Sequence, residues 1–529
     1  MERKQNNNTD TISIENWIDS SIVDELLKKC EIYGEKVAVV EGEKSLSYNK
    51  LSEQIIDTAH GFLNSGLNKG DRVVIQLPNG VNFVLSFFGL LKIGAIPILA
   101  LPAHRHRELE GIINYARPVG YIYQNTFMGF DYSGLANKLY EEFDHLNKMY
   151  PIERNNLIVN HLDIKISQEL PKVNGDDIAF LSLSGGTTGV PKLIPRTHAD
   201  YLYDTRMSIL RSKLTEDDAY LALLPMGHNF ILGHPGFIGT LLQGGKLIIN
   251  EYADMNEGLE LIETFKVSIL ALVPSMVKLM IEIQEDENYN ISSLRVIQVG
   301  GAFFEESISK KLMGIGGFKL QQVFGVAEGL NTMTSLNDDE ETIITTQGKP
   351  ISPYDVIKIV DEHGKELPFG EYGELLIKGP YTISSYYNDN QNIGAFTNTG
   401  FYRTGDRAKI DREGNLKIAG RIYEMINKAG EKITPSEIED YLSEDEAIKD
   451  CAVVGLPDKN QGEIVCAFII SDSKITLDYV RRYLMDKKIA NYKLPDRVFL
   501  IDVFPLTNVG KVNKKELIRI GKELIKNEY

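Results

Sequence analysis

The segment LSLSGGTTGVPKLIPR, residues 181–196, is the stretch from which the organisation of this chain can be worked out. Residues 180–183 form an apolar-to-small run typical of a buried strand, and the loop after it consists of Ser184, Gly185, Gly186, Thr187, Thr188 and Gly189, with Lys192 just beyond. Glycines allow close backbone approach and successive N–H groups form an anion-binding concavity, so this loop suits a polyphosphate. It is not a Walker A loop, because Val190 and Pro191 stand where that pattern needs Gly and Lys. The alternative is a flexible Gly/Thr surface turn.

Length, charge and cysteine content narrow the class of protein. A chain of 529 residues exceeds what one hydrophobic core usually supports, so two or more domains are expected. No run approaches the ~18 apolar residues of a membrane span, and the polar start MERKQNNNTD lacks an apolar signal core, so we expect a cytoplasmic protein without a membrane partner. The three widely spaced cysteines favour a reducing compartment. The net charge of −17 disfavours nucleic acid as a partner.

Strand and helix patterns alternate along most of the chain. Helical periodicity at 22–33, 48–64, 81–93, 197–213 and 230–243 lies between apolar strand-like runs, which predicts doubly wound α/β layers with parallel strands. Residues 343–418 read as short strands with turns, a small antiparallel β module. After Gly420 the pattern changes again. We therefore expect an α/β fold with a large N-terminal domain (1–420) of two doubly wound α/β subdomains plus the β module, and a smaller α+β C-terminal domain (421–529).

Further motifs follow the glycine loop in order, and together they carry a resemblance. They are FGVAE (324–328), QGKP (347–350), YRTGD (402–406), GR (420–421) and GK (510–511). The chain resembles the adenylate-forming superfamily of acyl-CoA synthetases, luciferases and non-ribosomal peptide synthetase adenylation domains. The stretches KLIPRTH (192–198), LPMGHNF (224–230), VFGVAEGL (323–330), TQGKPISPYD (346–355) and NYKLPDRV (491–498) most resemble stand-alone aryl-acid AMP ligases of siderophore pathways.

The resemblance implies sites for ATP and Mg²⁺. The loop from Ser184 to Gly189 would hold the β- and γ-phosphates, with Lys192 nearby, and Glu328 would hold Mg²⁺, which prefers carboxylate oxygen. Asp406 suits the two ribose hydroxyls, with Arg421 beside it. The adenine would lie against Gly300, Gly301 and Ala302, near Val323, Phe324 and Gly325. The alternatives are that Glu328 is an ordinary helix-start acid and Asp406 a turn residue.

Lys511 is the main catalytic candidate. The glycine before it permits a mobile tip, and the resemblance places its amine across the carboxylate and the α-phosphate, whereas Lys514 and Lys515 are expected to be surface lysines. The resemblance also implies that the C-terminal domain is a mobile lid that rotates between two reactions. The usual hinge residue is Lys or Asp, but this chain has Tyr423, and Ala429 replaces a Gly. We expect the rotation to persist with altered populations of the two states.

The acyl pocket of the resembling ligases begins at His228, which would lie beside the reacting carboxylate. Asn229 would bond an ortho hydroxyl, and Phe230, Gly301 and Val323 complete the lining. His234 stands where relatives have Ser or Cys, and Asn331 where they have Val. Because buried polar groups need partners, these two predict a substrate with polar substituents, such as a meta or para hydroxyl or amino group. The alternative is that His234 and Asn331 satisfy each other or the backbone, leaving a smaller pocket for a simple benzoate.

The function implied is ATP-dependent activation of an aryl carboxylic acid to acyl-AMP with release of pyrophosphate. Transfer to the phosphopantetheine thiol of an aryl carrier protein would follow, in siderophore or other secondary metabolite biosynthesis. The alternative is an aryl-CoA ligase with CoA as acceptor, and a non-catalytic nucleotide-binding relative is a third hypothesis. We expect a monomer or homodimer.

Overall fold

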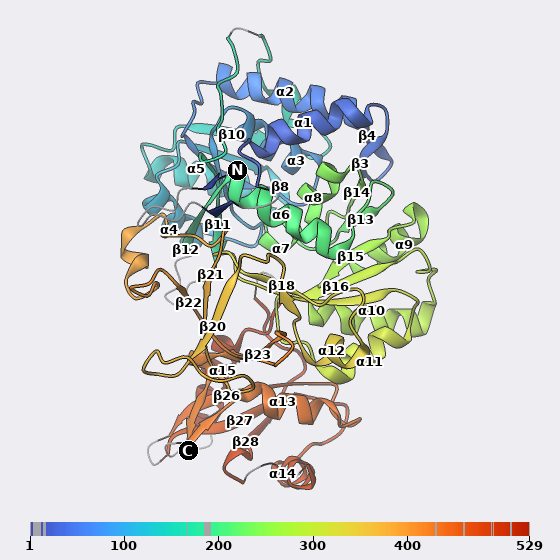
Figure 1. Cartoon of the computed structure of the whole chain (residues 1–529), viewed down its shortest axis with the longest axis vertical. Coiled ribbons are helices and arrows are strands. Elements are labelled where there is room, and N and C mark those ends of the chain that lie inside the picture. Colours follow the sequence, from blue (N-terminus) through green and yellow to red (C-terminus); the bar gives the residue numbers. More distant parts are fainter. Residues whose placement is uncertain are drawn as a thin grey trace.

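The computed structural model describes residues 2–3, 12–13, 17–166, 168–184, 192–428, 431–458, 461–487, 489, 491–507 and 510–527 (Figure 1). Two large sheets and a four-stranded module make up the N-terminal part, and another sheet forms the C-terminal part. The predicted fold class is confirmed: the chain is α/β, with a large N-terminal and a smaller C-terminal domain.

The first sheet has six strands in the order β10-β7-β5-β6-β11-β12, and β12 alone runs antiparallel to its neighbour. Side chains alternate along each strand, so Val73 and Ile75 of β5 enter one core and Val74 enters another. Helices α2 and α3 cover the first face, and α4 and α5 the second. The bounds are α2 (Tyr48–Asn64), β5 (Arg72–Gln76), α3 (Val81–Lys92), β6 (Ile96–Leu99), α4 (His106–Ala116), β7 (Gly120–Gln124), α5 (Tyr132–Glu142), β10 (Lys148–Ile152), β11 (Ile178–Ser184) and β12 (Lys192–Thr197).

The second sheet has nine strands in the order β19-β18-β17-β16-β15-β13-β14-β3-β4, parallel from β17 to β3 and antiparallel at both edges. Helices α9, α10 and α11 cover its outer face, while α1, α6 and α8 lie between the two sheets. The bounds are α1 (Ile22–Tyr33), β3 (Val37–Glu41), β4 (Lys44–Ser47), α6 (His198–Ser212), β13 (Ala219–Ala222), α8 (Gly236–Gln243), β14 (Lys246–Ile249), α9 (Met255–Phe265), β15 (Ile269–Leu272), α10 (Pro274–Glu287), β16 (Val296–Gly300), α11 (Glu306–Gly314), β17 (Lys319–Gly325), β18 (Asn331–Met333) and β19 (Lys349–Pro350).

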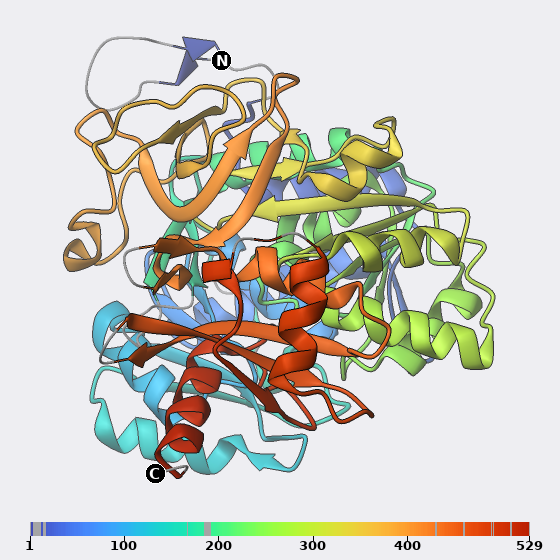
Figure 2. The same ribbon diagram turned by 90° about the horizontal axis from the view of Figure 1, so that it is seen from below.

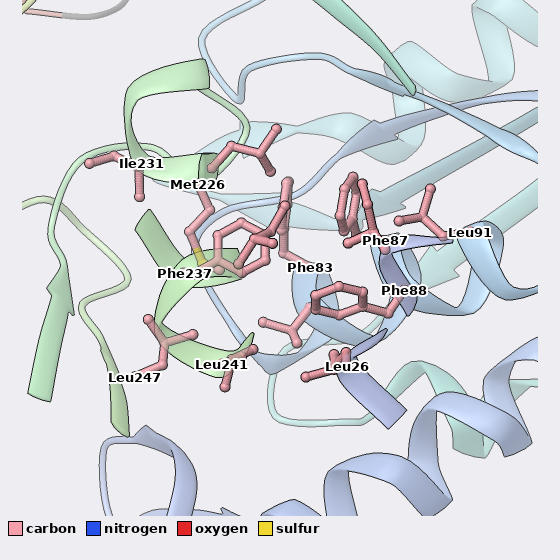
Figure 3. Close-up of a cluster of buried hydrophobic side chains, with 14 of the residues drawn as sticks. Leu26, Phe83, Phe87, Phe88, Leu91, Met226, Ile231, Phe237, Leu241 and Leu247 are labelled. Atoms are coloured by element: carbon pink, nitrogen blue, oxygen red, sulfur yellow. The ribbon is translucent and has the colours of Figure 1, made fainter. Parts of the chain in front are cut away.

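An aromatic core joins the two sheets. Phe83, Phe87 and Phe88 of α3 meet Phe237 of α8 edge-on, with ring centroids 6.0–6.1 Å apart (Figure 3). Leu26 of α1 and Leu247 of β14 extend the same cluster. Interiors packed this closely resist deformation, so the loops at the strand ends of both sheets keep fixed relative positions.

The antiparallel module and the C-terminal domain complete the chain. The module orders its strands β20-β21-β22-β23 around a small core and lies between the N-terminal sheets and the C-terminal domain in Figure 1. The C-terminal sheet follows the order β25-β24-β27-β26, with β28 parallel to β27, and carries cores on both faces. The bounds are β20 (Val356–Val360), β21 (Gly373–Lys378), β22 (Tyr402–Ile410), β23 (Leu416–Arg421), β24 (Ile426–Lys428), β25 (Glu431–Ile433), α13 (Pro435–Ser443), β26 (Asp450–Asp458), β27 (Gly462–Ile470), α14 (Leu477–Asp486), β28 (Arg497–Leu500) and α15 (Lys514–Asn527).

Short elements connect these layers. They are β1 (Glu2–Arg3), β2 (Ile12–Ser13), β8 (Thr126–Phe127), β9 (Phe130–Asp131), α7 (Asn229–Gly233), α12 (Glu340–Thr345) and the 3₁₀ turns at Ile158–His161, Asp389–Asn392, Ile422–Glu424 and Asn491–Lys493. Within the described ranges, no helix is both long and apolar enough to cross a membrane.

Ionic contacts fasten the C-terminal domain to the N-terminal part, against which it lies in Figure 2. Lys278 Nζ of α10 lies 3.2 Å from Glu305 Oε1 and 2.7 Å from Asp450 Oδ1 at the start of β26. Ser275 Oγ donates to the Gly510 carbonyl over 2.9 Å. We call the trio Lys278, Glu305 and Asp450 the lid clamp.

Two predicted elements differ from the structure. The single helix expected over residues 230–243 is wrong: α7 ends at Gly233 and α8 begins at Gly236, because Pro235 disfavours helical backbone at the preceding residue. The β module was expected from residue 343, but Ile343 lies in α12, capped by Asp339, and the first module strand begins at Val356.

Candidate active site

The glycine loop connects two strands that lie side by side. Ser184 ends β11 and pairs with Lys192, which begins β12. The predicted phosphate ligands Gly185, Gly186, Thr187, Thr188 and Gly189, like the side chain of Ser184, lie outside the described residues. Lys192 is described, and its Nζ donates to the Tyr386 hydroxyl over 3.0 Å.

Glu328 belongs to a buried hydrogen-bond network that reaches Lys192 through Tyr386. The Tyr386 hydroxyl donates to Glu328 Oε1 over 2.6 Å and lies 2.8 Å from the Tyr402 hydroxyl. Burial and the Glu328 carboxylate raise the pKa of Tyr386, so the phenol stays protonated and donates. No group of three or more His, Cys, Asp or Glu able to hold a metal occurs among the described residues. Mg²⁺ usually takes one or two carboxylates plus substrate phosphates, and Glu328 fits that donor set.

Asp406 is almost wholly buried, yet one of its carboxylate oxygens has no hydrogen-bond partner among the residues that the structure describes. Arg421 Nε lies 3.0 Å from Oδ1, and Arg421 also donates to the Thr404 carbonyl over 2.7 Å. The other oxygen, Oδ2, is buried, and no group in the described ranges hydrogen-bonds to it. Burial raises the pKa of Asp406 to about 6, against the opposing influence of Arg421. An orphaned buried acceptor calls for a donor, and a ribose hydroxyl supplies one.

Gly300 and Gly301 form a backbone shelf at the end of β16. A Cβ on Gly300 would lie 2.6 Å from the Val323 carbonyl oxygen of the adjacent strand, so no side chain fits between the strands. Gly301 has φ +85°, which glycine adopts without strain. Ala302 follows on the exposed side, while Val323, Phe324 and Gly325 end the neighbouring β17. The predicted adenine-binding residues are therefore contiguous.

Lys511 comes from the C-terminal domain into this same region. It lines a small pocket together with Leu224, Pro225, His228, Phe230, Val273 and Gly301. Its Cε would lie 3.5 Å from a Cβ built on Gly301. Burial and the positive charge of Arg421 lower the pKa of Lys511, while Asp406 opposes the shift. The charges of Lys511 and of Asp406, the predicted ribose-binding residue, therefore influence the pKa of each other.

His228 is a neutral donor in this arrangement. It caps α7, and its Nδ1 accepts from the Phe230 N–H over 3.3 Å. Burial, Lys511 and His234 lower the pKa of His228 to about 3, so its imidazole is uncharged at neutral pH. With Nδ1 accepting, the proton resides on Nε2, which can donate. Asn229 Oδ1 accepts from the Tyr201 hydroxyl over 2.9 Å, so the side-chain oxygen already has a partner.

His234 and Asn331 do not need a substrate to satisfy them. Both are about 2% exposed. Asn331 Nδ2 donates to Asp204 Oδ1 over 2.8 Å and lies 2.9 Å from His234 Nε2, which lies 3.0 Å from Asp204 Oδ2. The alternative, in which these two residues satisfy each other, describes the structure, and their pairing with a substrate's polar substituents stays a prediction. A partner that the sequence did not indicate, Asp204, completes the cluster.

Two family profiles match this chain. The profile of the family described as AMP-binding enzyme matches residues 26–387, and that of the AMP-binding enzyme C-terminal domain matches residues 437–511. The chain belongs to the AMP-binding enzyme family. It is an adenylate-forming ligase, and members of this family use ATP.

The relatives of this ligase include several that act on aryl acids. It is 39% identical to the 2,3-dihydroxybenzoate-AMP ligase of Bacillus subtilis, over 95% of this chain and 94% of the relative. Identity to the pyochelin synthase PchD of Pseudomonas aeruginosa is also 39%, over 96% and 94%. The apo structure of Mycobacterium smegmatis MbtA is 33% identical, with a TM-score of 0.72 and 95% of each chain covered. The predicted resemblance to aryl-acid AMP ligases is confirmed.

Three features of the ligase escaped the sequence prediction. Tyr386 links Lys192 to Glu328, and the one signal for it was an aromatic pair in a polar loop. Asp204 carried no local signal at all. Lys514, expected to be a surface lysine, instead lies 2.7 Å from Glu439 Oε1 and ties α15 to α13. The side chain of the predicted hinge Tyr423, and residue Ala429, lie outside the described part of the chain.

Proposed function

We propose that this ligase activates an aryl carboxylic acid with ATP and transfers the acyl group to the phosphopantetheine thiol of an aryl carrier protein in the cytoplasm. The observation that carries the proposal is the position of Lys511 in one pocket with His228 and Gly301, where the charge of the buried Asp406 acts on the pKa of the lysine. The names of the relatives, among them a 2,3-dihydroxybenzoate-AMP ligase, support the aryl substrate. A carrier protein rather than CoA as acceptor is the finer part of the proposal.

In the first reaction, an oxygen of the carboxylate attacks the α-phosphorus of ATP and the bond to the bridging oxygen breaks, releasing pyrophosphate. Both reactants are anionic, so the residues must supply positive charge and alignment. Lys511 brings a cation to the point where the two anions meet, and their approach favours its ammonium form. His228 donates a hydrogen bond from its Nε2–H to the carboxylate. Because its imidazole is neutral, it adds no positive charge that competes with Lys511.

The nucleotide is held by residues from three elements. The buried Oδ2 of Asp406 accepts a ribose hydroxyl, the shelf at Gly300 and Gly301 carries the adenine, and Lys192 contributes a cation near the phosphates. Glu328, oriented by the Tyr386 hydroxyl, would hold Mg²⁺. When bound, the metal ion neutralises phosphate charge.

In the second reaction, a thiolate attacks the acyl carbon, the bond from that carbon to the phosphate oxygen breaks, and AMP leaves. Lys511 lines the pocket proposed for the acyl group, so we infer that it withdraws before a thiol reaches the acyl carbon. We attribute the withdrawal to rotation of the C-terminal domain about the segment at Tyr423. The lid clamp breaks in that rotation, because Asp450 moves with the lid and Lys278 does not.

Acid-dependent ATP–pyrophosphate exchange tests the first reaction. A preorganised cation where charge develops contributes about 3–4 kcal/mol. Lys511→Ala should therefore lower the exchange rate about 100- to 1,000-fold. Lys522→Ala, an exposed lysine of α15 in the same domain, is the matched control and should leave it unchanged. An equal loss in both variants, or no loss in either, would refute the role of Lys511.

The acceptor is tested separately. Preformed acyl-AMP enzyme is offered a phosphopantetheinylated aryl carrier protein or CoA, and acyl transfer is followed by mass spectrometry. Faster transfer to the carrier supports the proposal, and faster transfer to CoA replaces it with an aryl-CoA ligase. Absence of exchange with every aryl acid would overturn the proposed function altogether.

A further inference from the structure

The segment that carries Lys511 is a tight turn of the C-terminal domain. Leu506 and Val512 pair across its base. Inside the turn, the Thr507 N–H donates to the Lys511 carbonyl over 2.6 Å, and the Lys511 N–H donates to the Thr507 hydroxyl over 3.1 Å. The Gly510 N–H donates to the Thr507 carbonyl over 2.9 Å. A contact that fixes one residue of this turn therefore also restrains the backbone of Lys511.

A hydroxyl group of the N-terminal part reaches this turn. Ser275 is the second residue of α10, and its Oγ donates to the Gly510 carbonyl over 2.9 Å. This carbonyl belongs to the peptide group that joins Gly510 to Lys511. Because a peptide group is planar, a bond to its oxygen also restrains the N–H and the Cα of the next residue. The hydroxyl of Ser275 thus acts on the direction from which the Lys511 side chain starts.

The residue just before α10 packs against the same turn. A Cβ built on Gly510 would lie 3.5 Å from Val273 Cγ2 and 3.8 Å from Ser275 Oγ, which are ordinary contact distances. Val273 also lines the pocket that holds Lys511, and its Cγ1 would lie 3.4 Å from a Cβ built on Gly301. The start of α10 therefore connects the turn with both the pocket and the glycine shelf.

Helix α10 contacts the C-terminal domain at two points. Ser275 and Lys278 lie three residues apart, on the same face of the helix. Lys278 binds Asp450, at the start of β26, through the lid clamp. Ser275 instead binds the turn that carries Lys511. The clamp holds the domain as a whole, whereas the serine acts on the turn alone.

We infer that Ser275 is a positioning residue for the first reaction and acts through Lys511. This inference rests on the proposed function. The hydrogen bond to Gly510 holds the turn in the arrangement in which Lys511 enters the pocket. In the proposed rotation Gly510 moves with the C-terminal domain and Ser275 does not, so this bond breaks before the second reaction. Ser275 therefore supports acyl-AMP formation and has no part in transfer to the thiol.

Ser275→Ala tests the inference in both half-reactions. Ser275 is exposed, so its loss leaves no buried group unpaired and the fold should tolerate alanine. A hydrogen bond between neutral groups shifts an equilibrium about 2- to 12-fold. The kcat of pyrophosphate exchange should fall by a factor in that range, with the KM values for ATP and the acid unchanged. Single-turnover transfer from preformed acyl-AMP to the thiol should stay constant or accelerate. Ser275→Thr keeps the hydroxyl and should restore exchange.

A double variant shows whether the effect passes through Lys511. In a Lys511→Ala background, Ser275→Ala should lower the residual exchange rate no further. Ser45→Ala, at an exposed serine of the edge strand β4, is the matched control and should leave both half-reactions unchanged. Full exchange activity in Ser275→Ala, equal slowing of both half-reactions, or multiplicative losses in the double variant would overturn the inference. Failure of the proposed function has a different signature, namely no exchange by the wild type with any aryl acid.

Discussion

The lid clamp offers the sharpest test of how the C-terminal domain is held. Lys278→Met removes the cation between Glu305 and Asp450 but keeps most of the side-chain volume. Two carboxylates from different domains are then left facing each other without compensation. We expect the orientation seen here to lose stability relative to any orientation in which the lid has moved away.

The size of the effect follows from the geometry. Unit charges about 4 Å apart interact by about 4 kcal/mol at an effective dielectric of about 20. The side chains of Lys278, Glu305 and Asp450 are 20%, 13% and 29% exposed, so water screens part of this. Breaking a fully buried pair costs about 3–5 kcal/mol, and an exposed pair contributes about 0.2–1 kcal/mol. We therefore expect Lys278→Met to destabilise the orientation seen here by about 2–3 kcal/mol. This corresponds to a shift of roughly 30- to 150-fold in the equilibrium between the two orientations of the C-terminal domain.

Two half-reaction assays detect this shift. Pyrophosphate exchange needs Lys511 in the pocket, so its rate should fall in Lys278→Met. The largest expected fall equals the shift in the orientation equilibrium. Single-turnover transfer from preformed acyl-AMP to the thiol should stay constant or accelerate. Lys310→Met, an exposed lysine on α11, is the control, and adding Asp450→Asn to Lys278→Met should restore part of the exchange rate because the facing charges are reduced. If both half-reactions slow equally, the clamp does not select an orientation and our reasoning fails.

Three further predictions concern single side chains. Burial and Glu306 raise the pKa of Asp440, on the lid helix α13, to about 8. The folded protein therefore keeps a proton on Asp440 that the unfolded chain loses near pH 3.8, so the free energy of unfolding falls as the pH rises from about 4 to 8. Asp440→Asn should make the melting temperature fall less steeply over this pH range. An unchanged slope of melting temperature against pH would contradict the prediction. Asp406→Asn should raise the KM for ATP about 10- to 150-fold in steady-state kinetics, because a hydrogen bond to a charged group contributes about 1.5–3 kcal/mol. The KM for the acid should stay constant. Tyr386→Phe should raise the Mg²⁺ concentration needed for half-maximal exchange several-fold, because Glu328 loses its orienting donor, and an unaltered Mg²⁺ titration would exclude that role.

Helix bounds can be predicted from the sequence where capping residues and apolar periodicity determine them. The helices Ile22–Tyr33 and Tyr48–Asn64 have the predicted bounds because Ser21 and Ser47 cap them and their apolar residues repeat three and four apart. The helix expected over 230–243 failed because apolar periodicity continues through a break that Pro235 imposes. Here a one-residue backbone constraint outweighs the pattern around it.

The acyl pocket shows what sequence order cannot convey. The sequence marks His234 and Asn331 as unusual, and both side chains have the partners that buried polar groups need. Their common partner lies 30 residues before one and 127 before the other. No local pattern marks Asp204, because its role depends on α6, α7 and β18 meeting in space. For the same reason the sequence predicts a surface lysine at Lys514, whereas the structure pairs it with Glu439 on another helix.

The near-complete burial of α6 has a consequence for how this enzyme could acquire a new substrate. Tyr201 and Asp204 share one helical face and bond Asn229 and His234, so a mutational library confined to that face would change how these two predicted pocket residues are held. The same helix is wedged between the two sheets, and most replacements on it would weaken the fold as well. Drift toward a new acid would therefore depend on spare folding stability gained beforehand elsewhere in the chain.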